Sequence, residues 1–194
     1  MLLSPKPNLD AAAVSAFMAS RRSTRDFSSR PVLQKTLDAV LKDALTAASW
    51  SNTRPFMVGV ASGEKRDRIS ADLLRRWAAL AEARRGGILA KLKLVFTASY
   101  AIPFMDYWFS STYHRSLIPR SQKVGRELYQ LLGVPRGDAK ARDEQWANNY
   151  KFFGAPTVVF VFIHKSLGVY AANDTGLFVQ NLMLSAKANG LGTC

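Results

Sequence analysis

The chain contains 194 residues, of which 48% are hydrophobic and 11% aromatic, and its formal net charge at pH 7 is +13. This composition is typical of a globular domain, and no stretch approaches the ~20 uninterrupted apolar residues of a membrane-spanning helix. The first ten residues lack the apolar run of a secretory signal peptide. The single cysteine, Cys194, excludes an intramolecular disulfide, so we expect one domain over residues 1–194 in a reducing cytoplasm.

The positive charge suits an anionic partner, because clustered Lys and Arg raise the local concentration of anions. Nucleic acid, a membrane surface and a phosphorylated small molecule all meet this description. The 27 basic residues, however, are spread along the chain and interleaved with 14 acidic ones, as in "EKRDR" at 64–68. This distribution favours a solvated basic surface over a nucleic-acid or membrane site.

The first half of the chain predicts three helices and one strand. Asp10 is a suitable N-cap for a helix that ends near the arginines at 21–22 and turns three apolar side chains inward, Val14, Phe17 and Met18. Apolar positions from Leu33 to Ala48 follow one face of a second helix. The turn-forming stretch "SWSNTRPF" at 49–56 ends it and leads into a strand at 56–61. A charged helix at 64–85 follows, closed by two glycines.

The second half predicts further helices and one buried strand. The aromatic stretch "YAIPFMDYWFSSTY" at 100–113 reads as a buried or interface helix, or as the wall of a pocket. Helices at 121–132 and 138–153 follow. The β-branched run "TVVFVFI" at 157–163 predicts a central strand, and a last helix at 172–189 stops at Gly190. Helices outnumber strands and do not alternate regularly with them, so no repeat or domain boundary is indicated.

Several chemistries are missing from the sequence. His114 and His164 lie far apart and have no Cys, Asp or Glu at ligand spacing, so no metal site is expected. There is no phosphate-binding glycine loop, no GxSxG elbow and no compelling carboxylate pair. If the chain is an enzyme, a cofactor should therefore carry the chemistry. The stretch "SRRSTRDF" at 20–27 suits such a cofactor, because guanidinium groups form bidentate, charge-assisted bonds with phosphate and also donate to carbonyl and ring-nitrogen positions.

Four segments, taken in order, resemble the FMN-dependent nitroreductase family. They are "RRSTRDF" at 21–27, "ASWSNTRPF" at 48–56, "FFGAPTVVFVF" at 152–162 and "QNLMLSAKANGLGTC" at 180–194. The resemblance implies an α+β nitroreductase-like fold, with a mixed central sheet flanked by helices. It also implies an intertwined homodimer with FMN at the interface. The family usually continues past "GLGTC" with a further strand, an arm and a basic residue for the FMN phosphate, and this sequence ends before them.

The resemblance also implies roles for individual residues. Arg21, Arg22 and Ser23 match residues that hold the FMN phosphate and ribityl chain, and Arg25 matches the basic residue near the pyrimidine edge. The loop at 49–52 matches one that reaches FMN from the partner subunit, with Asn52 also able to act as an ordinary turn residue. The sequence departs from the family's "SWSNTQP" pattern at Arg54, where the family has glutamine. The complete set of expected cofactor-binding residues is Arg21, Arg22, Ser23, Arg25, Ser49, Trp50, Asn52, Arg54, Gly190 and Gly192.

The function implied by the resemblance is an oxidoreductase that passes electrons from NADPH or NADH through FMN to a small-molecule acceptor, a nitroaromatic or a quinone. A ping-pong hydride transfer through flavin N5 needs no catalytic side chain, because the flavin carries the chemistry. Candidate substrate-pocket residues are Phe104, Tyr107, Trp108 and Phe109. The alternatives are a basic nucleic-acid-binding module and a flavin-binding protein without turnover.

Overall fold

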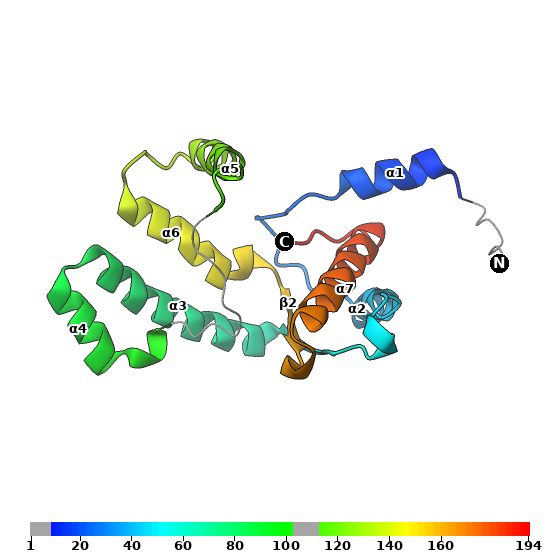
Figure 1. The fold of residues 1–194 in the computed structure, drawn as a ribbon, viewed down its shortest axis with the longest axis horizontal. Coiled ribbons are helices and arrows are strands. Elements are labelled where there is room, and N and C mark those ends of the chain that lie inside the picture. The colour runs from blue at the N-terminus through cyan, green and yellow to red at the C-terminus, as the bar shows by residue number, and fades with distance from the viewer. Residues whose placement is uncertain (1–8, 103–112) are drawn as a thin grey trace. The chain divides into compact units, whose positions relative to one another are not determined.

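The computed structural model describes residues 9–102 and 113–194, which contain seven α-helices and two β-strands (Figure 1). They divide into two compact units. Unit 1 contains the described residues up to Arg66 together with Gly154–Cys194, and unit 2 contains those of Asp67–Phe153. None of the helices described is long and apolar enough to cross a membrane.

The first helix of unit 1, α1 (Ala11–Ser20), begins as the sequence predicts. The carboxylate of Asp10 accepts a hydrogen bond from the Ala12 N–H at 3.0 Å and so caps the helix. The prediction that Val14, Phe17 and Met18 face a core is wrong for the described chain, because α1 buries none of its residues. Val14 and Met18 are 39% and 54% exposed, and Phe17 is only half-buried.

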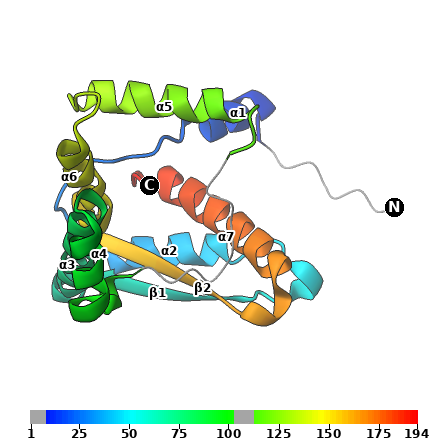
Figure 2. The ribbon, with the colours of Figure 1, turned by 60° about the vertical axis from the view of Figure 1, so that its left-hand side comes forward.

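The core of unit 1 forms where α2 (Gln34–Ala44) lies beside α7 (Val169–Ala188), as both views show (Figures 1 and 2). Val40 and Phe178 are buried there, and the Ser185 hydroxyl donates to the Asp43 carboxylate at 2.5 Å. α2 ends four residues earlier than predicted. The N–H and hydroxyl of Thr46 both bond to the Asp43 carbonyl, which tightens the chain into a turn.

The sheet of unit 1 consists of β1 (Phe56–Ser62) and β2 (Thr157–Ile163), paired antiparallel with Phe56 opposite Ile163. The Phe56 ring lies 4.5 Å from the Phe178 ring, so α7 covers one face of the sheet. Met57 and Phe162, which pair with each other across the two strands, point to the other face of the sheet and are 72% and 57% exposed. The predicted α+β class is confirmed, and in the described residues parallel pairing occurs only as a single bridge between Ser23 and Thr193.

Unit 2 is built from helices. The C-terminal part of α3 (Gly63–Arg85) belongs to it, with α4 (Ile88–Thr97), α5 (Ile118–Leu131) and α6 (Ala139–Tyr150). Trp77 on α3 is buried, and its indole N–H donates to the Asp143 carbonyl at 3.0 Å. Its ring also lies 5.9 Å from the Trp146 ring. These contacts fix α3 against α6.

The surface of α3 carries a local ion-pair cluster. The Arg76 guanidinium donates a hydrogen bond to Asp72 and thereby lowers the pKa of that carboxyl, with Arg75 adding to the effect. Arg85 pairs with Asp143 on α6. The charged helix expected from the sequence at 64–85 is confirmed, whereas α4 was not assigned from the sequence.

Candidate functional site

The arginine segment at 21–25 lies against the end of the chain. The Thr24 N–H donates to the Thr193 carbonyl at 2.9 Å, and Ser23 bridges to Thr193 in a parallel arrangement. Gly192 contacts Thr24 so closely that a Cβ atom there would lie 2.9 Å from the Thr24 hydroxyl oxygen. Gly190, at a φ of +73°, turns the chain out of α7 into this contact. The structure thus brings together Ser23 and Gly192, which the sequence predicts for one site. We call Arg21–Arg25 with Gly190–Thr193 the arginine group.

The three arginines of this group do not have the same surroundings. The Arg22 guanidinium donates to the Ala19 carbonyl at 2.6 Å and to the Arg21 carbonyl at 3.1 Å, so it caps the C-terminal end of α1. Within the described chain, no hydrogen-bond or ion-pair partner lies against the guanidinium groups of Arg21 and Arg25. Arg25 and Ser23 are exposed. Arg21 and Arg25 are therefore the cations of this group that remain available to an anion.

The second group is the loop at 49–54, which contains the short helix η1 (Trp50–Asn52). Ser51, Asn52 and Arg54 all have positive φ, at 49°, 56° and 46°. Such angles are costly for serine and arginine, less so for asparagine, and persist where the surroundings impose them. The Arg54 N–H donates to the Ser49 hydroxyl at 3.0 Å, which closes the loop on itself. We call these residues the loop group.

Asp174, on α7, binds the backbone of the loop group through a hydrogen bond. Its carboxylate, 3% exposed, accepts a hydrogen bond from the Trp50 N–H at 2.9 Å. The Trp50 ring lies 4.6 Å from the Tyr170 ring, one turn earlier on α7. Sequence analysis did not identify Asp174 or Tyr170 as part of this site. Asp174 extends the fourfold spacing of Phe178 and Leu182 toward the start of α7, so an acidic residue on an apolar helix face was the signal available.

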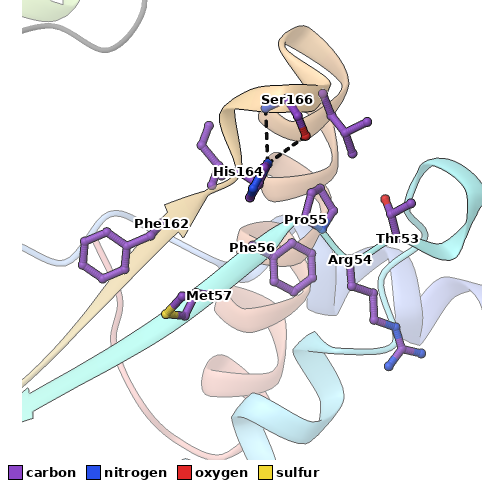
Figure 3. A pocket seen from close by; sticks show the side chains of 10 residues that line it. Thr53, Arg54, Pro55, Phe56, Met57, Phe162, His164 and Ser166 are labelled. Atoms are coloured by element: carbon purple, nitrogen blue, oxygen red, sulfur yellow. Dashed lines mark hydrogen bonds between the residues drawn. The ribbon is translucent and has the colours of Figure 1, made fainter.

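A surface pocket of about 530 Å³ adjoins the loop group (Figure 3). It lies where β1 begins and β2 ends. In Figure 3, Arg54 and the His164–Ser166 pair lie on opposite sides of Pro55 and Phe56. The His164 Nδ1 bonds to the Ser166 hydroxyl at 2.7 Å, so this histidine has a local structural partner. The lining residues are Thr53, Arg54, Pro55, Phe56, Met57, Phe162, Ile163, His164, Ser166 and Leu167.

The two groups lie toward opposite ends of α7. The loop group is bonded to Asp174 near the start of the helix, and the arginine group surrounds Gly190 at its end. At a rise of about 1.5 Å per residue, Asp174 and Gly190 are about 24 Å apart along the helix. One chain therefore assembles each group but does not bring the two groups together.

The remaining expectations concern the substrate pocket and metals. Phe104, Tyr107, Trp108 and Phe109 lie outside the described residues. Among residues 9–102 and 113–194, no group of three or more His, Cys, Asp or Glu side chains is placed to hold a metal ion.

The arginine group has the features that a phosphorylated cofactor requires. Arg21 and Arg25 supply cationic donors, Ser23 supplies a hydroxyl, and the absence of a side chain at Gly192 lets the C-terminal turn approach Thr24 closely. These residue types fit FMN, whose phosphate is anionic and whose ring edge accepts hydrogen bonds. The fold and the site thus define an α+β protein in which an arginine-rich segment is paired to the C-terminal turn.

Comparisons with known proteins agree with this class. The model described as "Nitroreductase family" matches residues 18–194, and the chain belongs to that family. It is 30% identical over 179 residues to the 4-nitrobenzoate reductase of Pseudomonas putida, covering 92% of this chain and 70% of that protein. It is also 30% identical over 189 residues to nitroreductase NfnB of Mycolicibacterium smegmatis, covering 97% and 72% of the two chains.

Solved structures show the same fold. The crystal structure of the FMN-dependent nitroreductase NfnB from Mycobacterium smegmatis in complex with NADPH matches with a TM-score of 0.79 at 29% identity, over 95% of this chain and 74% of that one. The FMN and NADPH-dependent NfnB from Sphigopyxis sp. strain HMH matches with a TM-score of 0.70 at 29% identity, over 93% and 73%. The nitroreductase-like fold expected from the sequence is confirmed.

Proposed function

We propose that the protein is an FMN-dependent oxidoreductase that uses NADPH or NADH to reduce nitroaromatic compounds, and quinones as further acceptors. The observation that carries this proposal is the pairing of the arginine segment with the C-terminal turn of α7, which gathers Arg21, Ser23, Arg25 and Gly192 in one place. Family membership over residues 18–194 and similarity to nitroreductases that use FMN and NADPH support it.

When bound, FMN would supply the redox chemistry, accepting a hydride from NAD(P)H at N5 and returning two electrons to the acceptor. The protein's residues hold and polarise the site. Arg21 and Ser23 would bind the phosphate and ribityl chain, and Arg25 would place positive charge at the pyrimidine edge. Because NAD(P)H and the acceptor would use the same face in turn, we expect ping-pong kinetics and no essential acid or base side chain.

We further propose that the site is completed by a second copy of the chain in a homodimer. The arginine group and the loop group lie about 24 Å apart along α7 in one chain, at about 1.5 Å per residue. In the described chain no residue of α1, the helix next to the arginine group, is buried. A symmetric partner would supply its loop group to the arginine group of the first chain, and the reverse. The two compact units would then serve as one catalytic domain in the cytoplasm.

The first test is the visible absorption spectrum of the protein reconstituted with FMN, recorded before and after anaerobic addition of NADPH and then NADH. Loss of the oxidised-flavin bands with either nucleotide is expected. Flavin that binds but is reduced only by a chemical reductant would instead indicate flavin binding without turnover. A protein that binds no FMN, and whose only ligand is nucleic acid with a steep salt dependence, would refute the proposal.

The second test asks whether the two groups of a site come from different chains. Arg25→Ala and Asn52→Ala should each abolish most activity when expressed alone. Coexpressed, they form heterodimers in which one site carries both substitutions and the other carries neither. Random pairing of such chains recovers about a quarter of the wild-type activity. If both groups came from the same chain, every mixed site would carry one substitution and activity would stay low.

A further inference from the structure

We propose that Arg54 recognises a carboxylate, so that the pocket beside it selects nitroaromatic substrates that carry an acid group. This inference rests on the proposed function, because it names the substrate class of the same site. Arg54 is also the position at which the chain departs from the "SWSNTQP" pattern. The departure replaces a neutral amide with a permanent cation.

The backbone of Arg54 is fixed in a conformation that does not suit its side chain. Its φ of 46° lies in the left-handed region, which glycine and asparagine adopt at lower cost. The Arg54 N–H donates to the Ser49 hydroxyl at 3.0 Å, and its carbonyl accepts from the Phe56 N–H at 2.8 Å. Pro55, which follows, is buried. These bonds thus fix the backbone from which the Arg54 side chain starts, at the edge of the pocket.

The guanidinium of Arg54 is available to a ligand. Within the described chain no carboxylate lies against it, and none of the residues lining the pocket is acidic. An arginine without a carboxylate partner, on a rigid backbone, is suited to a bidentate bond with an incoming carboxylate. His164 is a further polar residue of the lining, beside Thr53 and Ser166. Its Nδ1 accepts from the Ser166 N–H at 3.3 Å, so Nδ1 is bonded within the chain and Nε2 is the ring nitrogen left for a ligand.

The walls of the pocket fit an aromatic ring. Phe56, Met57 and Phe162 contribute apolar surface, and the last two are the exposed large side chains of the sheet face. A volume of about 530 Å³ falls in the range of small-molecule sites, which combine apolar walls with a few polar groups. Inorganic phosphate would gain nothing from such walls, whereas a benzoate would bury its ring against them and present its carboxylate to Arg54.

The pocket also adjoins the loop group, which we propose takes part in the flavin site. Arg54 is two positions beyond Asn52, on the loop group that we propose completes the flavin site of the partner. A substrate held by its acid group there would direct the opposite end of its ring away from the cation. In 4-nitrobenzoate that end carries the nitro group, which takes two electrons and two protons to give a nitroso group and water, with NAD(P)H as the electron donor.

The test compares 4-nitrobenzoate with nitrobenzene, which lacks the acid. In Arg54→Gln, the ratio of kcat/KM for 4-nitrobenzoate to that for nitrobenzene should fall about tenfold, the lower part of the range for a bond to a charged group. The change should reside in KM. Arg54→Lys, which keeps the charge but not the fork, should give an intermediate ratio. Arg30→Gln removes an exposed arginine elsewhere in unit 1 and should leave the ratio unchanged.

Equilibrium binding of benzoate gives a readout that needs no turnover. Benzoate should quench the tryptophan fluorescence of the wild-type protein saturably, and Arg54→Gln should weaken this binding about tenfold. If the wild type binds benzoate through Arg54 but reduces no nitro compound, the proposed function fails and the acid-binding pocket stands. Equal losses for both substrates, a change confined to the KM of NADPH, or benzoate binding that does not depend on Arg54 would overturn the inference.

Discussion

Replacing Asp174 with alanine should loosen the loop group while leaving the arginine group intact. Asp174 is almost fully buried, and its carboxylate accepts the Trp50 N–H at 2.9 Å and an Asn173 amide N–H at 3.4 Å. Alanine leaves the Trp50 N–H without an acceptor. A buried donor that loses its partner costs about 1–3 kcal/mol. We expect Asp174→Ala to lower the free energy of unfolding by about 2 kcal/mol.

For a chain of this length, 1 kcal/mol corresponds to a shift in Tm of about 2–4 °C. Asp174→Ala should therefore lower Tm by about 4–8 °C in thermal unfolding followed by circular dichroism. Asp174→Asn retains an oxygen acceptor for the Trp50 N–H but brings a new amide donor that needs a partner. It should cost about half as much. Asp26→Ala removes an exposed acid and serves as the matched control.

The same variants separate positioning from stability. If Asp174 positions the loop group at the flavin, the dissociation constant for FMN should rise about tenfold in Asp174→Ala, which corresponds to about 1.4 kcal/mol. A fluorescence titration with FMN at a temperature well below both Tm values measures this. A Tm and an FMN affinity that both match those of Asp26→Ala would show that the Asp174–Trp50 bond contributes nothing, and would refute the reasoning.

Three other substitutions test the remaining contacts. Gly192→Ala should weaken FMN binding and lower the free energy of unfolding by about 1–3 kcal/mol, because its Cβ would clash with the short, branched side chain of Thr24. Gly125→Ala is the control: it lies inside α5 with open space around it and should raise the free energy of unfolding by about 1 kcal/mol. Arg22→Ala should lower Tm through its lost helix cap yet change FMN affinity less than Arg25→Ala, and equal losses of affinity would show that Arg22 binds the cofactor. Trp77→Ala should destabilise by about 3–5 kcal/mol in denaturant unfolding. Trp77→Phe should destabilise by less, because an aromatic ring remains, although the indole hydrogen bond and part of the buried ring volume are lost.

The strands and most helices follow from local sequence. β2 has the predicted bounds, because a run of β-branched and aromatic residues between turn signals has no competing helical pattern. β1 extends one residue beyond its prediction. α6 begins where Asp138 caps it, and it ends earlier than expected because Phe152 and Phe153 adopt positive φ. Local pattern does not reveal that two large aromatic side chains occupy a left-handed turn.

The candidate site depended on information that periodicity does not contain. The resemblance selected Ser23 and Gly192 separately, but their contact is a pairing between distant segments that only the fold supplies. Arg22 looked equivalent to Arg21, since sequence does not show that one guanidinium folds back on the carbonyls of α1. The roles of these residues toward FMN remain predictions. The sequence does not predict the role of Asp174, because its partner is a backbone N–H, a group that almost every residue carries.

The helix α7 explains why two chains would make two equal sites. It contains 20 residues, holds the loop group near its start and leads into the arginine group at its end. An α-helix cannot shorten, so the groups of one chain stay apart in any conformation that keeps α7 intact. A two-fold axis perpendicular to α7, passing beside its middle, would place the start of each helix next to the end of the other. Each site would then receive one arginine group and one loop group, and Arg54 would contribute its charge to the site that its own chain cannot complete.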